Sequence, residues 1–236
     1  ISVIIPVYNA QDTIEQTVHS VTSQSYQNLE IILVNDGSTD TSYEICKKLQ
    51  LEDSRIKIFD KENGGVASAR NIGIAHATGQ YIIHADADDI VLPNAYLNLI
   101  NEANRSNAAI VVGGYYSGFE NNYVEKIPGI EIKDPVVFSK QMLQDKIHAG
   151  LWNKLVKNSL YENFKFIDSL DYKEDLIFFV TQIMGTKPKI SIIQDPVYFY
   201  YTRNSSITNQ DFDKNVEKNF TVIKSIEKLK YKELDY

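Results

Sequence analysis

The chain has 236 residues, of which 43% are hydrophobic and 23% charged, so it is long enough to bury the core of one large soluble globular domain. Its formal net charge of −7 argues against a general nucleic-acid-binding protein, because such proteins carry a basic face. Cys46 is the only cysteine, which excludes an intramolecular disulfide and a cysteine-based metal site and favours a reducing compartment.

No stretch reaches the ~18 apolar residues of a membrane-spanning helix. No basic segment followed by an apolar run marks a signal peptide. We therefore expect a cytoplasmic protein.

Strands and helices are predicted to alternate over residues 1–116. Near-continuous apolar runs such as residues 29–34 are typical of strands that are covered on both faces. In chain order we expect strand 2–9, a helix from Asp12, strand 29–34, helix 41–51, strand 55–59, helix 66–77, strand 81–84, helix 93–106 and strand 109–116. This alternation predicts the α/β class, with a mostly parallel, doubly wound sheet flanked by helices.

The regular alternation ends at about residue 117. The remaining expected elements are a hairpin turn at 121–122, a helix at 134–145 started by Asp134 and Pro135, a short amphipathic segment at 150–155, a helix at 171–184, a strand at 190–201 with Pro196 inside it, and a helical pattern from 213 onward. We expect residues 117–208 to complete the same domain and residues 209–236 to form a helical extension.

Polar residues follow three of the predicted parallel strands. Asn9 follows the first strand, Asp36 the second, and Asp86 the fourth. Ligands of such sheets bind beyond the carboxyl ends of the strands, so these side chains should lie along one edge. Asp86 and Asp88 form an Asp-x-Asp pair, which can hold a hard cation and its phosphate ligands. The alternative for this pair is a solvated acidic turn that caps the next helix.

Asp36 has two interpretations. A carboxylate at the exit of a strand can accept the imide N–H of a uracil ring, which cytosine does not present. Residues 36–40 can equally be a turn that leads into a helix capped by Asp40 or Thr39.

Several common motifs are absent. Residues 6–9 stand where a dinucleotide-binding domain has a glycine-rich loop, and the chain has neither a P-loop nor a Gly-x-Ser-x-Gly elbow. An EF-hand loop that began at Asp86 would need an oxygen ligand and a glycine where Ile90 and Val91 stand.

Seven motifs occur in the order and spacing of a known family. They are Ile4-Ile5-Pro6-Val7-Tyr8-Asn9, Val34-Asn35-Asp36-Gly37-Ser38-Thr39-Asp40, Gly65-x4-Arg70-Asn71, Asp86-Ala87-Asp88-Asp89, Trp152-Asn153-Lys154-Leu155, Glu174-Asp175-Leu176-x-Phe178 and Tyr200-Tyr201-x-Arg203-x2-Ser206-Ile207-Thr208. Over about residues 1–208 they resemble the family-2 glycosyltransferases of GT-A fold, and the last three motifs resemble bacterial members.

The resemblance implies an activity. It implies inverting, metal-dependent transfer of a hexose or N-acetylhexosamine from a UDP-sugar to a hydroxyl of a glycan, glycolipid or glycoprotein acceptor. Mn²⁺ or Mg²⁺ would be the cofactor, with Asp88 as its direct ligand, and Asp175 would be the catalytic base. Residues 1–116 would bind the nucleotide sugar, and residues 117–208 would supply the acceptor site and the base.

The resemblance also implies contacts with both substrates. On the donor side these are Pro6, Tyr8, Asn9 and Asp36 around the base and ribose, Arg70 as a brace of the acidic cluster, Asp86 at the ribose or the donor sugar, and Arg203 and Ser206 near the diphosphate. Asp89 would support the metal ligand or cap a helix. On the acceptor side Trp152 would floor the sugar pocket, with Glu174 beside the base.

Each of these roles has a structural alternative. Asp175 can be a solvated residue on a core helix, Trp152 a core aromatic, and His84 a packed strand histidine rather than a metal ligand. His148 has no assigned role. The basic amphipathic pattern at 214–232 can contact an anionic membrane at the inner face or a second copy of the chain, although a surface helix packed on the domain is the default.

Two other functions compete with transfer. The alternative function is a catalytically silent module that binds nucleotide sugars or acts as a scaffold. A nucleotidyltransferase ranks low, because the glycine-rich loop after the first strand is missing.

Overall fold

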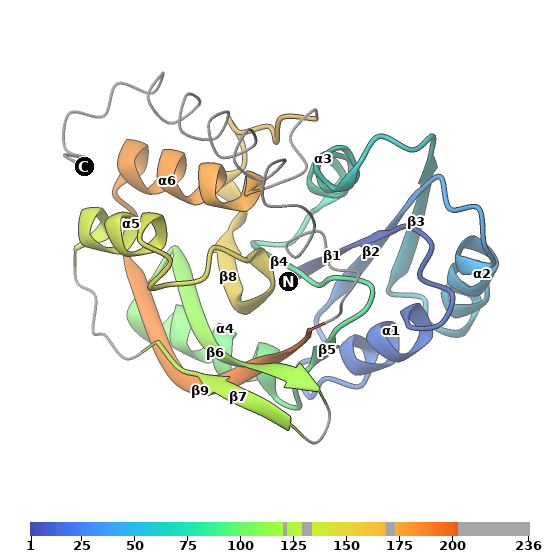
Figure 1. Cartoon of the computed structure of the whole chain (residues 1–236), viewed down its shortest axis with the longest axis horizontal. Coiled ribbons are helices and arrows are strands. Elements are labelled where there is room, and N and C mark those ends of the chain that lie inside the picture. Colours follow the sequence, from blue (N-terminus) through green and yellow to red (C-terminus); the bar gives the residue numbers. More distant parts are fainter. Residues whose placement is uncertain (120–121, 129–133, 169–172, 203–236) are drawn as a thin grey trace.

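The computed structural model describes residues 1–119, 122–128, 134–168 and 173–202, which form an α/β structure (Figure 1). In the first half the strands are β1 (Ser2–Val7), β2 (Glu30–Asp36), β3 (Ile56–Lys61), β4 (Tyr81–His84) and β5 (Ile90–Val91), and the helices are α1 (Ile14–Thr22), α2 (Ser42–Glu52), α3 (Val66–His76) and α4 (Ala95–Ser106). The second half contains β6 (Ile110–Phe119), β7 (Asn122–Lys126), β8 (Lys154–Lys157), β9 (Ile190–Tyr201), α5 (Pro135–Leu143), α6 (Glu174–Thr186) and the short 3-10 helices η1 (Leu151–Asn153) and η2 (Asn158–Leu160).

Within the described ranges all strands join one sheet, in the order β3-β2-β1-β4-β8-β6-β9-β5, and β7 pairs with β6 beside this path. Strands β3, β2, β1 and β4 run parallel, as the alternation of strands and helices predicts. The continuation is mixed: β8 is antiparallel to both β4 and β6, β9 is parallel to β6, and β5 is antiparallel to β9. The predicted α/β class with flanking helices is confirmed, and antiparallel pairs extend its parallel core.

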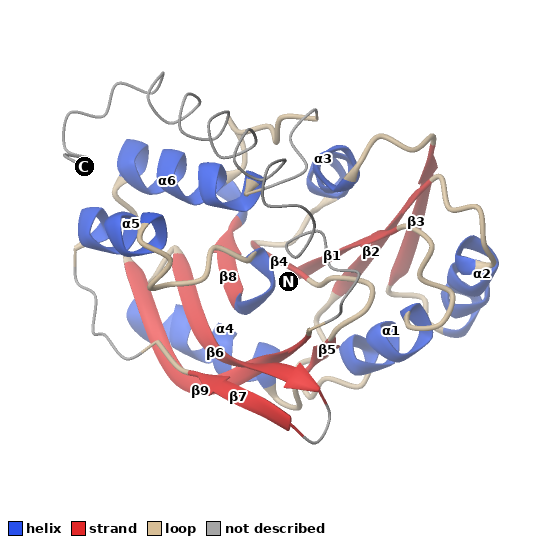
Figure 2. Ribbon diagram, viewed as in Figure 1, coloured by secondary structure: helices blue, strands red, loops and turns tan. Residues whose placement is uncertain are grey.

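Helices on both faces explain the near-continuous apolar runs of the central strands. Side chains alternate between the faces along a strand, so Val3 and Ile5 of β1 pack in one core and Ile4 packs in the other. Helices α1, α2 and α4 contribute to the first core, and α3, α5 and α6 to the second (Figure 2). A strand buried on both faces needs apolar residues at nearly every position.

Strand β8 connects the two halves of the chain. The short amphipathic segment expected at residues 150–155 contains η1 and the first two residues of β8. Val156 pairs with Ile82 of β4 on one side and with Ile110 of β6 on the other. The expected strand at 190–201 is β9, and Pro196 lies where the register between β6 and β9 shifts. This position suits proline, which has no N–H to donate to a regular ladder.

The observed helix starts settle two expectations. Asp134 caps α5 by accepting the N–H of Val136 at 2.7 Å, and Pro135 is the first helical residue, so the predicted start is confirmed. Helix α4 begins at Ala95 with Asn94 as its N-cap. The acidic turn at 86–89 therefore does not cap the next helix, and that alternative is wrong.

In the part of the chain that the structure describes, no helix is long and apolar enough to span a membrane. The helical pattern at 214–232 and the whole of the predicted extension at 209–236 lie outside the described residues.

Candidate active site

A cavity of about 1020 Å³ lies between the carboxyl ends of β1 and β4 and the N-terminus of α6. Several predicted site residues line it: Tyr8, Asn9, Arg70, Asp86, Asp88, Trp152, Glu174 and Asp175. Pro6 and Asp36 do not line it, and Arg203 and Ser206 lie outside the described residues. Both halves of the chain thus contribute to one cavity.

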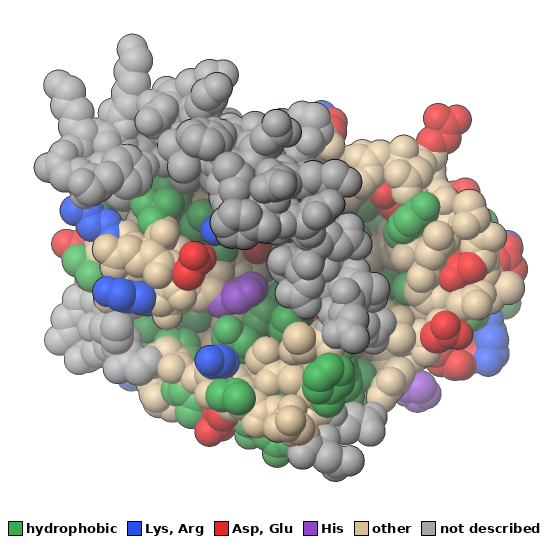
Figure 3. Space-filling model, viewed as in Figure 1, with side chains coloured by type: hydrophobic (Ala, Val, Ile, Leu, Met, Phe, Trp, Pro, Cys, Tyr) green, Lys and Arg blue, Asp and Glu red, His purple; other side chains and the backbone are tan. Residues whose placement is uncertain are grey.

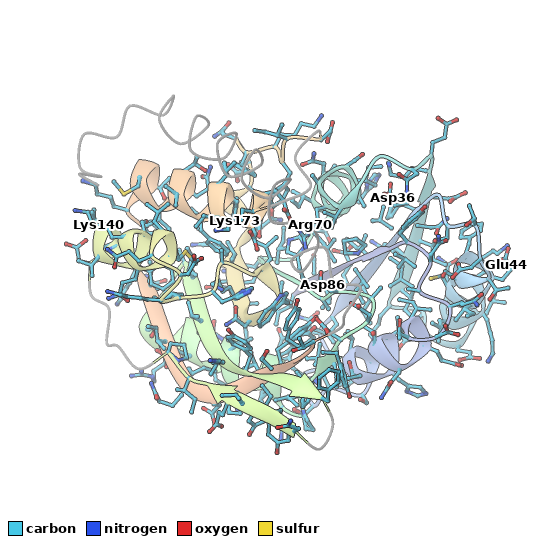
Figure 4. The ribbon with its side chains drawn as sticks, in the orientation of Figure 1. Asp36, Glu44, Arg70, Asp86, Lys140 and Lys173 are labelled. Carbon is cyan, nitrogen blue, oxygen red and sulfur yellow. The ribbon has the colours of Figure 1, made fainter. Side chains whose placement is uncertain are left out.

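Arg70 of α3 connects the acidic turn after β4 to α6. Its side chain is buried, with Nη2 donating to Asp86 Oδ1 at 3.3 Å and Nη1 donating to Glu174 Oε1. Figure 4 shows the labelled Arg70 and Asp86 side chains on adjacent elements near the centre of the molecule. The buried guanidinium holds both carboxylates in place through charge-assisted hydrogen bonds. Loss of any one of the three groups would leave a buried charge unpaired.

The acidic turn has more negative charge than Arg70 balances. Burial, together with the charges of Asp88 and Asp175, raises the pKa of Asp86 although the Arg70 guanidinium opposes the shift. An added cation would therefore be stabilised here.

The residues present fit a hard divalent cation. Carboxylate oxygens such as those of Asp86 and Asp88 are the ligand type that Mg²⁺ and Mn²⁺ prefer. Among the described residues, no three His, Cys, Asp or Glu side chains converge to hold a metal by themselves. A cation here would need further oxygen ligands from a phosphate-bearing substrate, as Mg²⁺ commonly takes.

Asp89 connects the acidic turn to α1 and β9. It is buried; its Oδ1 accepts the N–H of Tyr201 in β9 at 2.9 Å, and its carbonyl accepts Thr17 Oγ1 of α1 at 2.8 Å. Burial and the charges of Asp86 and Asp88 raise the pKa of Asp89 to about 8. Of the two roles expected for Asp89, the helix cap is wrong, because α4 starts at Ala95.

Asp36 lies at the end of β2 and holds the loop that leads into α3. Its carboxylate accepts Lys61 Nζ at 2.5 Å, Gly64 N at 3.0 Å and Gly65 N at 2.8 Å. A carboxylate offers about four lone-pair sites, so three donors leave room for one more. Figure 4 shows Asp36 beside β2 and β3, where a second cavity of about 540 Å³ is lined by its neighbours Gly37 and Lys61.

Asn9 joins the exits of β1 and β2. Its side-chain oxygen accepts Thr39 N at 2.8 Å, and its own N–H donates to Ser38 Oγ at 3.1 Å. Asn9 has a φ of 47°, a left-handed conformation that asparagine tolerates better than most residues. The preceding Tyr8 is 52% exposed and offers its ring to the cavity.

Asp175 lies in the first turn of α6, opposite the acidic turn. It is half-buried, and its Oδ1 is 2.7 Å from the N–H of Leu176. The N-terminus of a helix favours a negatively charged side chain, so Asp175 suits this position. Its neighbour Glu174 is 8% exposed, accepts a hydrogen bond from Arg70 and also lines the cavity.

Trp152 borders the cavity beneath other aromatic side chains. It is 4% exposed and stacks on Tyr198 and Tyr200, with ring centroids 4.6 and 5.6 Å apart. The ring of Tyr115 packs edge-on against Trp152, with ring centroids 4.8 Å apart. The accessible aromatic surface is therefore that of Tyr115, Tyr200 and His148.

Sequence reasoning gave no role to three of these neighbours. Tyr115 follows the apolar part of a strand, and His148 stands outside every motif, so no local signal marks either residue. Lys154 stands in a quoted motif and is fully buried, and burial lowers the pKa of its ammonium to about 7. Figure 3 shows a face on which acidic, basic, histidine and hydrophobic side chains are all exposed near the centre.

Comparison with known proteins identifies the family. The model of a family described as Glycosyl transferase family 2 matches residues 2–168. The chain belongs to this family. Family 2 and the GT-A fold, both predicted from the motifs, are thereby confirmed.

Bacterial relatives of this glycosyl transferase resemble it along most of its length. It is 33% identical over 227 residues to Glycosyltransferase GlyG of Streptococcus pneumoniae, covering 90% of this chain and 74% of that protein. It is 31% identical over 217 residues to the uncharacterized glycosyltransferase EpsJ of Bacillus subtilis, covering 88% of this chain but only 62% of EpsJ.

Solved structures share the fold. S. aureus TarS residues 1–349, in complex with UDP, superpose with a TM-score of 0.76 at 19% identity over 97% of this chain and 64% of that chain. GalNAc-T7 with UDP, GalNAc and Mn²⁺ gives a TM-score of 0.65 at 22% identity over 86% of this chain and 44% of that chain.

Proposed function

We propose that this family-2 glycosyl transferase moves a hexose or N-acetylhexosamine from a UDP-sugar to a hydroxyl of a glycan, glycolipid or glycoprotein acceptor, with inversion at the anomeric carbon. One observation carries the proposal: a single cavity brings Asp86 and Asp88 together with Asp175. The TarS complexes with UDP and UDP-GlcNAc and the GalNAc-T7 complex with Mn²⁺ support a nucleotide-sugar donor and a divalent cation.

The donor would bind along the strand exits. We assign Pro6, Tyr8, Asn9 and Asp36 to the base and ribose, with the remaining acceptor site of Asp36 taking the imide N–H of uracil. Asp86 would contact the ribose or the donor sugar. Arg203 and Ser206, outside the described residues, remain assigned to the diphosphate.

Asp88 would hold the cation. When bound, Mn²⁺ or Mg²⁺ stabilises the negative charge that develops on the leaving UDP. Asp86 and Glu174 both pair with Arg70, so the direct contact with the cation is assigned to Asp88. The acidic turn then keeps a net negative charge, which attracts a cation from the solvent.

Asp175 would act as the general base. The acceptor hydroxyl loses its proton to the Asp175 carboxylate while its oxygen bonds to the anomeric carbon and the bond from that carbon to UDP breaks. A single base on the face opposite the leaving group gives inversion. A glycosidase would instead need two carboxyl groups at a set separation around the scissile bond.

The acceptor side is formed by the second half of the chain. Residues 117–208 would bind the glycan, lipid-linked or protein-linked sugar, and residues 1–116 the donor. A bacterial cytoplasmic location is our proposal from the single cysteine, which suits a reducing compartment.

A UDP-release assay tests the function. It would use a panel of UDP- and GDP-sugars, each with and without Mn²⁺. We expect a UDP-sugar to be cleaved only when Mn²⁺ is present. Preference for a GDP-sugar would overturn the role of Asp36. A rise in melting temperature with UDP, but turnover of no donor in the panel, would favour the silent binding module.

A further inference from the structure

His148 borders the cavity, and the transfer proposed above gives it no role. It is exposed and lies on the loop that precedes η1. Its ring centroid lies 5.1 Å from that of Trp152, 5.7 Å from that of Tyr115 and 6.3 Å from that of Tyr200. The imidazole thus extends the accessible aromatic surface of the acceptor half.

One ring nitrogen of His148 is already occupied. The N–H of Gly150 donates to His148 Nδ1 at 2.9 Å. A nitrogen that accepts a hydrogen bond carries no proton, so the neutral ring has its proton on Nε2. Among the described residues none accepts a hydrogen bond from Nε2, so the neutral ring has one N–H donor for a ligand in the cavity that it lines.

The surroundings of the ring as a whole favour this neutral state. Although part of the ring is exposed, desolvation by the side chains packed around it and the nearby Lys154 ammonium lower the pKa of His148, and the charges of Asp175 and Asp145 oppose this shift.

The loop that holds His148 is anchored by a buried charge. Lys154 Nζ donates to the carbonyls of His148 and Gly150, each at 2.7 Å, and to Asn153 Oδ1 at 2.6 Å. Asn153 Nδ2 in turn donates to the carbonyl of Gly113 in β6 at 2.8 Å. Three donated bonds satisfy the ammonium and fix the loop against the sheet.

Gly150 completes this geometry. A Cβ at this position would lie 2.6 Å from Trp152 Nε1 and 2.8 Å from His148 Nδ1. A side chain there would separate the imidazole from the Gly150 N–H that fixes its tautomer. The local sequence is therefore built to hold the His148 ring in one orientation.

We propose that His148 is a specificity-determining residue for the acceptor. Its Nε2–H donates a hydrogen bond to an oxygen of the acceptor sugar, which lies on the aromatic surface of Tyr115 and Tyr200. Asp175 lines the same cavity, so a hydroxyl of a sugar held in this way can reach the proposed base. A site with aromatic walls and few fixed polar groups suits such a ligand. The inference rests on the proposed function.

Binding of simple sugars tests it. The probes are the methyl β-glycosides of glucose, galactose and N-acetylglucosamine, added to the protein with saturating UDP and Mn²⁺. The readouts are the His148 Cε1–H signal in NMR spectra and the glycoside affinity. His148→Gln keeps an N–H donor near the position of Nε2, whereas His148→Phe keeps a ring without a donor. His19→Gln replaces an exposed histidine of α1 as the matched control.

We expect at least one glycoside to shift the His148 signal. The loss of one hydrogen bond predicts that His148→Phe weakens that glycoside's binding about five- to tenfold. His148→Gln should stay within about threefold of the original protein. His19→Gln should change nothing, and UDP affinity, measured by calorimetry, should be the same in all variants.

Three outcomes would overturn the inference: no glycoside shifts the His148 signal, the phenylalanine variant binds as tightly as the original protein, or the glutamine variant is as weak as the phenylalanine variant. UDP binding separates these results from a failure of the proposed function. If UDP and Mn²⁺ do not bind the original protein, the proposed function fails and the inference fails with it.

Discussion

Arg70 is hydrogen-bonded to Glu174 across 104 residues of sequence, and Glu174 directly precedes Asp175. The same guanidinium contacts Asp86 at 3.3 Å, so one buried side chain positions both the acidic turn and the start of α6. The acidic turn and the start of α6 are thereby held at a set separation. In the proposed mechanism, Arg70 positions Asp86 and Glu174 and does not contact the reacting atoms.

Arg70→Met should strongly destabilise the fold. The substitution leaves Asp86 and Glu174 without a counter-charge in a buried setting, which predicts a loss of about 3 kcal/mol or more in the free energy of unfolding. Urea unfolding at pH 7 measures it. Arg105→Met is the control, because Arg105 is largely exposed although it also pairs with a glutamate, and it should have a much smaller effect. Equal effects of the two substitutions would contradict the bracing role.

Asp88→Asn should remove the effect of metal on UDP binding. The amide keeps the shape of the side chain and loses the charge that attracts a divalent cation. Calorimetry with UDP should then give the same affinity with and without Mn²⁺, whereas Mn²⁺ should tighten binding to the original protein. Asp195→Asn, at an exposed position of β9, should keep the metal effect. A full metal effect in the Asp88 variant would assign the cation to other ligands.

Asp175→Asn should separate binding from transfer. The amide cannot take a proton from the acceptor hydroxyl, and loss of a general base typically lowers the rate about 10²–10⁴-fold. The rate of sugar transfer and the UDP affinity should be measured on the same preparation. UDP affinity should be unchanged, and so should both quantities in Asp195→Asn. Undiminished transfer by Asp175→Asn would rule out the base assignment.

Gly73→Ala should destabilise the packing of α3 on β1. A Cβ at Gly73 would lie 2.4 Å from Cγ2 of Ile4, and such overpacking costs about 1–3 kcal/mol. Thermal or urea unfolding measures the loss. In the double variant Ile4→Ala/Gly73→Ala the new methyl group has space. The two losses should therefore be less than additive, and strict additivity would show that Ile4 is not the obstacle.

Glu30→Gln should make the free energy of unfolding less dependent on pH in the acidic range. Burial raises the pKa of Glu30, but hydrogen bonds from Lys57, Ser2 and Thr78 outweigh it and lower that pKa to about 2. Because the pKa in the folded state lies below the unfolded value, the ionised side chain stabilises the fold above the unfolded pKa of about 4.5.

That stabilisation is lost as the pH falls through about 2. At pH 7 the substitution should cost about 1 kcal/mol after allowance for solvent screening, and the difference should shrink between pH 4.5 and 2. Urea unfolding across this range measures it, with the exposed Glu52→Gln as control. A difference that does not vary with pH would contradict the ionic contribution.

Local patterns in the sequence were enough to predict much of the parallel core. Its central strands β1, β2 and β4 carry apolar residues for two covered faces, and the helices between them follow a helical period, so these elements can be read without long-range information. The strand exits with Asn9, Asp36 and Asp86 follow from the same reading, because parallel strands present their carboxyl ends at one edge. The order and spacing of the motifs indicated the family.

Only the tertiary structure decided how the second half completes the site. The four residues of β8 join the two halves through antiparallel pairs, and such a short strand has no distinct period. Trp152 is covered by aromatic residues from β6 and β9, whereas His148 is exposed; burial of a single side chain depends on neighbours that are distant in sequence. The pairing of Arg70 with Glu174 has the same physical origin: residue types can be read locally, but their contacts exist only once the chain has folded.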